Sequence, residues 1–227
     1  MMKDAKGIVD FHAHILPGAD HGSGSLETTL WQLNAAKAVG VDRIVATPHF
    51  YPHKHSVDSF IERRNKAYDS LKKSIPAGVS IKLGAEVLIC QGIERLPDIE
   101  KLFVEGTRTL LLELPFNMFD ECYCESVKEL CNMGVDVIIA HADRYTEEVI
   151  KKMLRSGARL QLNAGSLTRL FKRRCVVSWL RDGTVVALGS DIHGKDKKAY
   201  SDFARAVKYA GDRAEYIKKQ SDVIWNK

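Results

Sequence analysis

Seven short apolar runs recur along this chain of 227 residues, and they constrain its fold more than any other feature. They are rich in Val, Ile and Leu and almost continuous in apolarity, which is typical of strands buried on both faces of a parallel sheet. Most are followed by a helix-like segment, and such alternation predicts an α/β fold with right-handed crossovers. Seven units favour a distorted seven-stranded (β/α) barrel over the usual eight-stranded one. The runs cover residues 8–14, 43–49, 79–87, 107–115, 135–143, 158–165 and 185–193.

The segments between the runs carry signals for helix ends. Ser25 is placed to cap a helix that stops at Gly40. A second helical pattern stops at Pro76, and two more, over 120–133 and 145–156, stop at a glycine. No internal repeat, low-complexity segment or linker interrupts the chain, so residues 1–227 are expected to form one domain. The first helix is expected to place on one face Leu26, Leu30 and Leu33.

Composition excludes several classes of protein. No apolar run approaches the roughly 20 residues that cross a bilayer, and the N-terminal segment lacks the apolar stretch of a signal peptide. Five cysteines without a C-x-x-C pair favour reduced thiols. We therefore expect a cytoplasmic protein without membrane insertion. The modest net charge of +5 comes without interleaved aromatics, so no nucleic-acid partner is expected, and the oligomeric state is left open.

Nearly every apolar run ends at a histidine or a carboxylate. His12 and His14 are two residues apart on an extended backbone, so both imidazoles point the same way. In barrels of this kind the functional residues stand at the carboxyl ends of the strands. Asp20 and His21 lie on the loop after the first run, whereas His53 and His55 are expected to face solvent or substrate. The strand-end residues are His12, His14, His49, Glu86, Glu113, His141, Asp191 and His193.

Convergent charged side chains of this number point to bound metal. Burying several of them unpaired would cost several kcal/mol, and a cation removes that cost. The candidates outnumber the ligands that one ion needs, and a carboxylate can bridge two ions. A site for two or three divalent ions is therefore expected.

The order of these motifs resembles the polymerase-and-histidinol-phosphatase (PHP) superfamily. The motifs are His-x-His, Thr-Pro-His, Gly-x-Glu, Leu-Leu-Glu, Ala-His-x-x-Arg, Asn-Ala-Gly-Ser-Leu and Ser-Asp-x-His. Within it, residues 15–18, 112–116 and 163–167 are most similar to the manganese-dependent bacterial tyrosine phosphatases, which oppose the tyrosine autokinases of capsule and exopolysaccharide export. The resemblance implies a trinuclear site for Mn²⁺, with Fe or Zn²⁺ as alternatives. It also implies a phosphotyrosine protein, such as an autokinase, as substrate.

The resemblance further implies how the ligands are shared. One ion would use His12, His14, Glu86 and Asp191, and a second would share Glu86 and add Glu113 and His141. A third would use His49, His193 and a residue of the first loop. Alignment places that last ligand on His21, where the family usually has Asp, and Asp20 is the alternative.

Two basic residues are expected to bind the phosphate. The resemblance makes Arg144 a phosphate clamp, and Lys198 stands near the place of an arginine that the family has. Lysine supplies a point charge without the bidentate fork of arginine, so this replacement bears on substrate affinity.

The chemistry expected of this site is hydrolysis by a metal-bridged hydroxide. A water between two metal ions has its pKa lowered from ~16 towards ~7. No cysteine nucleophile is needed, and the Cys-x₅-Arg string of cysteine phosphatases does not occur. Three alternatives stay open: a small-molecule phosphoesterase such as histidinol-phosphate phosphatase, an amidohydrolase or TatD-like hydrolase, and a non-catalytic scaffold.

Overall fold

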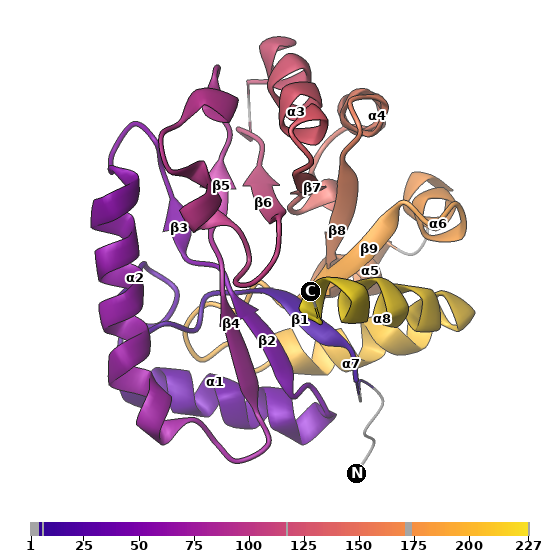
Figure 1. The fold of residues 1–227 in the computed structure, drawn as a ribbon. Helices are drawn as coiled ribbons and strands as arrows, with labels where there is room; N and C mark the ends of the chain where they lie inside the picture. The colour runs from indigo at the N-terminus through magenta and orange to yellow at the C-terminus, as the bar shows by residue number, and fades with distance from the viewer. Residues whose placement is uncertain (1–4, 6, 117, 171–173, 227) are drawn as a thin grey trace.

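A single parallel sheet of nine strands forms the centre of the protein (Figure 1). The computed structural model describes residues 5, 7–116, 118–170 and 174–226. The N-terminal residues 1–4 and 6, in which no signal sequence was expected, lie outside these described residues, as does the side chain of Cys175. The strand order is β3-β5-β6-β7-β8-β9-β1-β2-β4. The strands are β1 (Val9–Ala13), β2 (Arg43–Ala46), β3 (His49–Phe50), β4 (Ser80–Leu83), β5 (Glu86–Leu88), β6 (Thr109–Glu113), β7 (Asp136–Ile139), β8 (Arg159–Asn163) and β9 (Val185–Gly189).

The predicted strand count of seven is too low because two of the apolar runs break. Pro48 has no N–H to donate to a ladder, and it separates β2 from β3. The second run breaks at Gly84 and Ala85, between β4 and β5. β2 pairs with β4 and β3 pairs with β5, so the two ends of the sheet are consecutive pieces of the same two runs. This arrangement gives the curved, barrel-like sheet of Figure 1.

Helices lie around the sheet, and the sheet separates the core into two clusters, one on each face. Side chains alternate along each strand, so Leu110 and Leu112 belong to the large cluster under the helices, while Leu111 belongs to a second one. Ile224 in the last helix joins that second cluster and packs with residues of β1, β7 and β9. The helices are α1 (Leu26–Val39), α2 (Val57–Leu71), α3 (Cys122–Asn132), α4 (Glu147–Arg155), α5 (Ala164–Leu170), α6 (Arg174–Arg181), α7 (Ala199–Ala210) and α8 (Asp212–Trp225). Short 3₁₀ turns are η1 (Lys72–Ser74), η2 (Ile93–Arg95), η3 (Ile99–Leu102) and η4 (Ala142–Arg144).

None of the helices in the described part of the chain is both long enough and apolar enough to span a membrane. The four cysteines whose side chains are described are free thiols, as expected: Cys90, Cys122, Cys124 and Cys131.

Helix α1 begins and ends where the sequence predicts, and of the predicted leucine face it buries Leu33, packs Leu30 against the core and leaves Leu26 exposed. Ser25 caps it, and Gly40 ends it with a left-handed φ of 96°. Leu26 is 37% exposed, whereas the polar Thr29 and Gln32 are fully buried. The reason is hydrogen bonding to nearby loops: Thr29 donates to the carbonyl of Ile15 at 2.8 Å, and Gln32 donates to that of Gly194 at 2.9 Å. Two polar anchors thus share the buried face of α1 with Leu33 and Ala36.

Replacing Ser25 by Ala is expected to lower the free energy of unfolding by about 1 kcal/mol. The Ser25 hydroxyl accepts the N–H of Thr28 at 3.1 Å, and alanine leaves that donor without a side-chain partner. Ser25→Gly should lower the free energy of unfolding by only a few tenths of a kcal/mol, since glycine is tolerated at this position. Urea unfolding of the three proteins measures the difference. Equal stability of the Ala and Ser proteins would contradict the role of the cap.

Candidate metal centre

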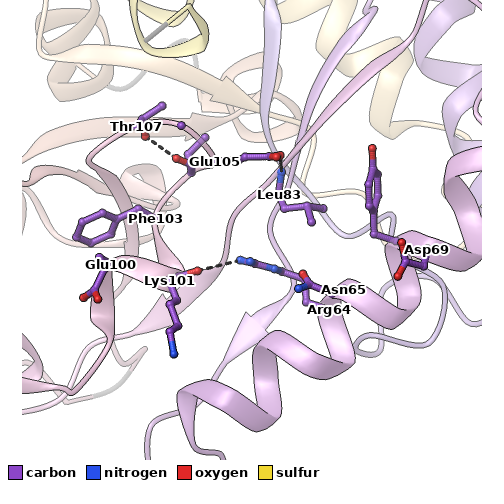
Figure 2. Close-up of a pocket in the computed structure, with 12 residues that line it drawn as sticks. Arg64, Asn65, Asp69, Leu83, Glu100, Lys101, Phe103, Glu105 and Thr107 are labelled. Carbon is purple, nitrogen blue, oxygen red and sulfur yellow. Dashed lines mark hydrogen bonds between the residues drawn. The ribbon is translucent and has the colours of Figure 1, made fainter.

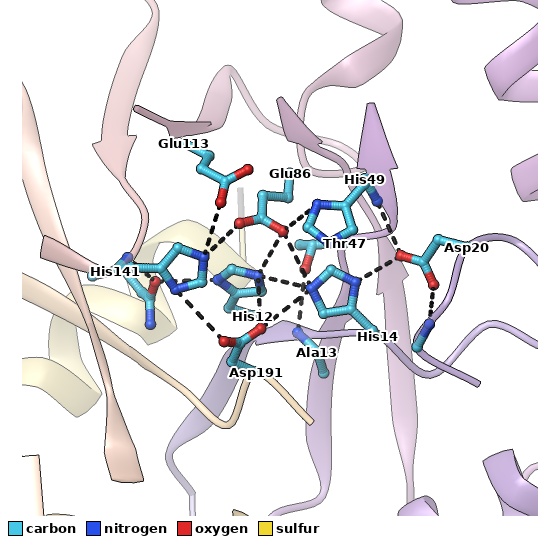
Figure 3. Close-up of polar contacts among 12 residues, drawn as sticks. His12, Ala13, His14, Asp20, Thr47, His49, Glu86, Glu113, His141 and Asp191 are labelled. Carbon is cyan, nitrogen blue, oxygen red and sulfur yellow. Dashed lines mark hydrogen bonds and ion pairs between the residues drawn. The ribbon is translucent and has the colours of Figure 1, made fainter. Parts of the chain in front are cut away.

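Glu86 is the centre of a buried cluster at the carboxyl ends of the strands (Figure 3). Its Oε2 lies 3.2 Å from Nε2 of both His12 and His14, and 2.9 Å from Nδ1 of His49. Its Oε1 lies 2.6 Å from Nε2 of His141. The Glu86 side chain has no exposed surface. One carboxylate therefore joins histidines from β1, β3 and the segment after β7.

Two further carboxylates face the same histidines. Asp191 Oδ1 lies 3.7 Å from His12 Nε2 and 3.5 Å from His14 Nε2. Glu113 Oε1 lies 3.9 Å from His141 Nε2. Four groups of three side chains each have ligand atoms within 4.8 Å of one another. They are His14–His49–His193, His12–Glu86–His141, His12–His14–Asp191 and His49–Glu86–Glu113.

The arrangement of these ligand atoms suits bound divalent metal better than it suits hydrogen bonding among the side chains. Glu86 Oε2, His49 Nδ1 and His193 Nε2 are buried without a hydrogen bond of acceptable geometry. The Nε2 atoms of His12 and His14 face each other at 3.1 Å. Imidazole nitrogens and carboxylate oxygens turned towards shared space are the mixed donor set that Mn, Fe and Zn²⁺ accept. The structure thus brings together eight of the nine side chains that the sequence predicts as metal ligands.

Burial raises the pKa of the Glu86 carboxyl, but the charge of His12, the close approach of the His12 and His14 imidazoles, and the hydrogen bond with His141 hold that pKa well below its usual range. The pKa of Asp191 is likewise lowered, because hydrogen bonding to His14 and nearby imidazole charge outweigh burial. Burial and the charge of Glu86 raise the pKa of Glu113. Histidine protons stabilise these carboxylates, and a bound cation would take the place of those protons.

The first loop places its two candidate ligands differently. Asp20 Oδ2 accepts hydrogen bonds from His14 Nδ1 at 2.7 Å and from the backbone N–H of His49 at 3.1 Å. Asp20 therefore orients His14 from the side away from Glu86. His21 is exposed, and its ring stacks on His49 with centroids 4.9 Å apart. A Cβ on Gly22 would lie 2.1 Å from the Cβ of His14, so only glycine allows this turn.

Arg144 is the cation nearest to the cluster. Its Nη2 lies 2.6 Å from Asp191 Oδ2, and its side chain is 39% exposed. Lys198 is exposed just before α7 and does not line the cavity over the cluster. His53 also lies exposed and outside the four groups. The cavity, of about 450 Å³, is lined within the described residues by His21, His49, Tyr51, His141, Arg144, Asp191 and His193.

Of the three described non-glycine residues with a left-handed backbone, two belong to the cluster, and the third is Asp98. His141 has φ 50° and Asp191 has φ 51°, a left-handed conformation that costs non-glycine residues about 1–3 kcal/mol each. The N–H of Asp191 donates to the carbonyl of His12 at 2.8 Å, and the N–H of Arg144 donates to that of His141 at 2.7 Å. The surrounding fold thus holds both side chains in place against their local preference.

Several buried polar residues lie behind the cluster that were not predicted from the sequence. Asp10 Oδ1 accepts the backbone N–H of Ser190 at 2.8 Å, which joins β1 to the loop after β9, and burial raises the pKa of Asp10 to about 6. Gln161 and Asn163 alternate with leucines on β8, so both amides point to one face. That alternation inside an apolar run is the signal that would have found them.

A second cavity, of about 430 Å³, lies apart from this cluster, beside α2 and η3 (Figure 2). Its buried cation is Arg64, whose Nη1 donates to the carbonyls of Gly84 at 3.0 Å and Lys101 at 3.3 Å. Burial lowers the pKa of Arg64 to about 10, so it stays charged at neutral pH. Arg64 ties α2 to η3 and to the break between β4 and β5, and its role here is structural.

Comparison with known proteins places this site in a family. Tyrosine-protein phosphatase YwqE of Bacillus subtilis (strain 168) is 27% identical over 185 residues, which cover 77% of this chain and 71% of that protein. "Putative tyrosine-protein phosphatase CapC" of Staphylococcus aureus is 31% identical over 169 residues, 70% of this chain and 66% of that protein. A crystal structure from work on YwqE of Bacillus subtilis and CpsB of Streptococcus pneumoniae, called metal-dependent tyrosine phosphatases, has the same fold. Its TM-score is 0.76 at 21% identity, with 96% of this chain and 94% of that chain covered. Residues 8–221 match the family described as capsular polysaccharide synthesis, CpsB/CapC, and the chain therefore belongs to that family.

Proposed function

We propose that this chain is a metal-dependent phosphatase that hydrolyses phosphotyrosine on a protein. The observation that carries the proposal is the cluster around Glu86, in which four histidines face one buried carboxylate beneath a cavity that also contains Arg144. The names of the relatives YwqE and CapC support tyrosine phosphate as the substrate class.

The proposed centre holds two to three divalent ions, Mn²⁺ in the first place, with Fe or Zn²⁺ as alternatives. When bound, the ions supply Lewis acidity towards water and towards the phosphoryl oxygens. Asp20 is proposed to orient His14, whereas His21 is proposed to close the third site, since its ring lies against His49 and His193. The proposed ligands are His12, His14, His21, His49, Glu86, Glu113, His141, Asp191 and His193.

Arg144 is proposed to bind the phosphoryl group. Its guanidinium lies at the wall of the cavity, and its fork can donate to two phosphate oxygens at once. Lys198 is not given this role, because it lies outside the residues that line the cavity. A tyrosinate leaving group, with a pKa of about 10, needs little help from a general acid.

A cysteine nucleophile is not part of the proposal. Among the described residues, no cysteine lines the cavity over the cluster. Burial also raises the pKa of the thiols of Cys90, Cys124 and Cys131, which disfavours the reactive thiolate.

An apolar cavity beside Arg144 supports a peptide substrate over a small polar one. Arg144 lines both cavities, so a phosphate bound by this residue has apolar surface next to it. Phe116 and Met118 are 76% and 74% exposed there, and a phosphotyrosine peptide would cover them. Histidinol phosphate, the second candidate substrate, would leave most of this surface in water. The cavity, of about 210 Å³, is lined by Leu114, Pro115, Phe116, Met118, Phe119, Arg144, Tyr145, Thr146 and Val149.

A tyrosine autokinase of capsule or exopolysaccharide export is the proposed physiological substrate, with the reaction taking place in the cytoplasm. The match to a capsular polysaccharide synthesis family supports this partner.

Metal analysis and paired substrates test the proposal. The protein loaded with Mn²⁺ should carry two to three ions per chain, and its kcat/KM should be higher for a phosphotyrosine peptide than for histidinol phosphate. Removal of metal by a chelator should lower turnover by about 100-fold or more, with recovery on adding Mn²⁺ back. Fewer than one ion per chain would point to the scaffold alternative. Faster turnover of histidinol phosphate would instead favour the small-molecule phosphatase.

A further inference from the structure

Two buried amides on β8 contact three members of the cluster without pointing into its cavity. Gln161 is fully buried and Asn163 is 7% exposed. Gln161 Oε1 lies 3.2 Å from His12 Nδ1, and Asn163 lies 3.0 Å from His141 Nδ1 and 2.9 Å from Asp191 Oδ2. Both histidines are contacted at Nδ1, the nitrogen that faces away from Glu86.

A backbone N–H fixes the orientation of the first amide. The N–H of His141 can only donate, and it lies 2.9 Å from Gln161 Oε1. The atom at that position must therefore be the amide oxygen, and the amide nitrogen then donates to Asn163 Oδ1 at 3.0 Å. An amide orientation that is normally ambiguous is settled here by the main chain.

The tautomer of His12 follows from this orientation. Gln161 Oε1 can only accept, so His12 Nδ1 must carry a proton to bond with it. The other nitrogen, Nε2, is then the one available to a metal, and it lies 3.2 Å from Glu86 Oε2.

The same logic passes through Asn163 to the rest of the cluster. Since the Gln161 amide nitrogen donates to Asn163 Oδ1, that atom is an oxygen, and His141 Nδ1 must donate to it as well. His141 Nε2, 2.6 Å from Glu86 Oε1, is thereby left to face the cluster. The Asn163 amide nitrogen then donates to Asp191 Oδ2, which turns Asp191 Oδ1 towards His14 and His12.

The turn η4 and strand β9 pack against this part of β8. The backbone N–H of Asn163 donates to Asp143 Oδ1 at 2.9 Å. On β9, a Cβ at Gly189 would lie 2.6 Å from the Gln161 amide nitrogen and 2.5 Å from the Cβ of His12. Glycine at that position gives Gln161 and His12 the space in which they meet.

We infer that Gln161 and Asn163 form one positioning unit, which sets the tautomers of His12 and His141 and the rotation of Asp191 for metal binding. The inference rests on the proposed metal-dependent function. Neither residue is a ligand: each acts through hydrogen bonds on side chains that are.

Gln161→Glu separates this unit from simple packing, because it keeps the shape while it replaces the amide donor by an oxygen and adds a negative charge, as the control Gln220→Glu also does. The new carboxylate still accepts from His141 N–H and His12 Nδ1, but it can no longer donate to Asn163. The Asn163 amide should turn over, so that its nitrogen faces His141 Nδ1 and forces the opposite tautomer on that ring, while His12 keeps its own. Asn163→Asp should leave both tautomers in place and remove the hydrogen bond to Asp191.

Two measurements that need no turnover decide the matter. Imidazole nitrogen NMR of the metal-free protein, at a pH where both rings are neutral, should show Nδ1–H on His12 and His141 in the native chain, and Nε2–H on His141 alone in Gln161→Glu. Competition titration with Zn²⁺ should give affinities about 10–100-fold weaker for Gln161→Glu and Asn163→Asp. Gln220→Glu is the control, since that amide contacts Arg159 at the amino-terminal end of β8, away from the cluster at the carboxyl ends of the strands, and should change neither result.

The outcomes separate the inference from the proposed function. Native Zn²⁺ affinity in both β8 variants, or an Nε2–H proton on His12 in the native chain, would overturn the inference. Weakened Zn²⁺ binding in the two β8 variants would uphold the inference. If the native chain also failed to hydrolyse phosphotyrosine, the proposed function would be rejected while the inference stood. Gln161→Leu, with thermal unfolding as a check, extends the test should the Glu variant fail to fold.

Discussion

Glu86→Gln is expected to lower kcat/KM for a phosphotyrosine peptide by about 10³-fold, together with the metal content. The oxygens of Glu86 lie within 3.2 Å of four histidines. Glutamine keeps the shape, but it offers a single neutral oxygen and turns an amide nitrogen towards the other histidines. Since an amide nitrogen does not bind metal, the variant cannot join two ions. Metal analysis and steady-state kinetics on the same preparation measure both effects.

The exposed Glu62 on α2 provides the matched control for this substitution. Glu62→Gln makes the same chemical change away from the cluster and should leave metal content and kcat/KM as in the native chain. Glu86→Gln with full metal occupancy and near-native turnover would contradict the proposed ligand set at its centre. Loss of turnover with full metal occupancy would indicate that Glu86 is not a required ligand and acts in the reaction itself.

Much of the fold can be predicted from the sequence because strands buried on both faces appear in it as short, continuous apolar runs. Each apolar run contains a strand, and the glycines Gly134 and Gly157 follow α3 and α4 in the left-handed conformation. The strand count differs because Pro48 looks like part of an apolar run, while its missing N–H matters only in the ladder. Thr29 and Gln32 join Leu33 on the buried face of α1 because their hydrogen bonds go to carbonyls that only the folded loops bring near.

The same holds for the cluster: some of its residues can be predicted from local sequence patterns, whereas others depend on tertiary structure. Residues such as His12 and Glu113 were found because the carboxyl ends of parallel strands meet at one edge of a sheet. Gln161 escaped attention because an amide among leucines becomes meaningful only when His12, from a strand 149 positions away, lies against it. The left-handed backbone at His141 and Asp191 carries no sequence mark at all, since neither residue is a glycine.

Arg144→Met is expected to lower kcat/KM for a phosphotyrosine peptide by about 100-fold while leaving the metal content unchanged. Arg144 pairs with Asp191 at 2.6 Å, and it lines both the cavity over the cluster and the apolar cavity beside it. Methionine keeps the length of the side chain and removes the charge. Asp191 would still accept the Asn163 amide, so its position should survive the change. Arg144→Lys should give an intermediate loss, because an ammonium group lacks the bidentate fork.

Arg155→Met, at an exposed position in α4, controls for the loss of one positive charge and should have native kinetics. The comparison of metal content with turnover decides between two roles for Arg144. If the residue binds the phosphoryl group, its removal lowers turnover at constant metal occupancy, and inorganic phosphate becomes a weaker inhibitor. If it only restrains Asp191, metal occupancy falls together with turnover, and added Mn²⁺ restores both. The second result would contradict the phosphate-binding role, because a lost substrate contact cannot be replaced by more metal.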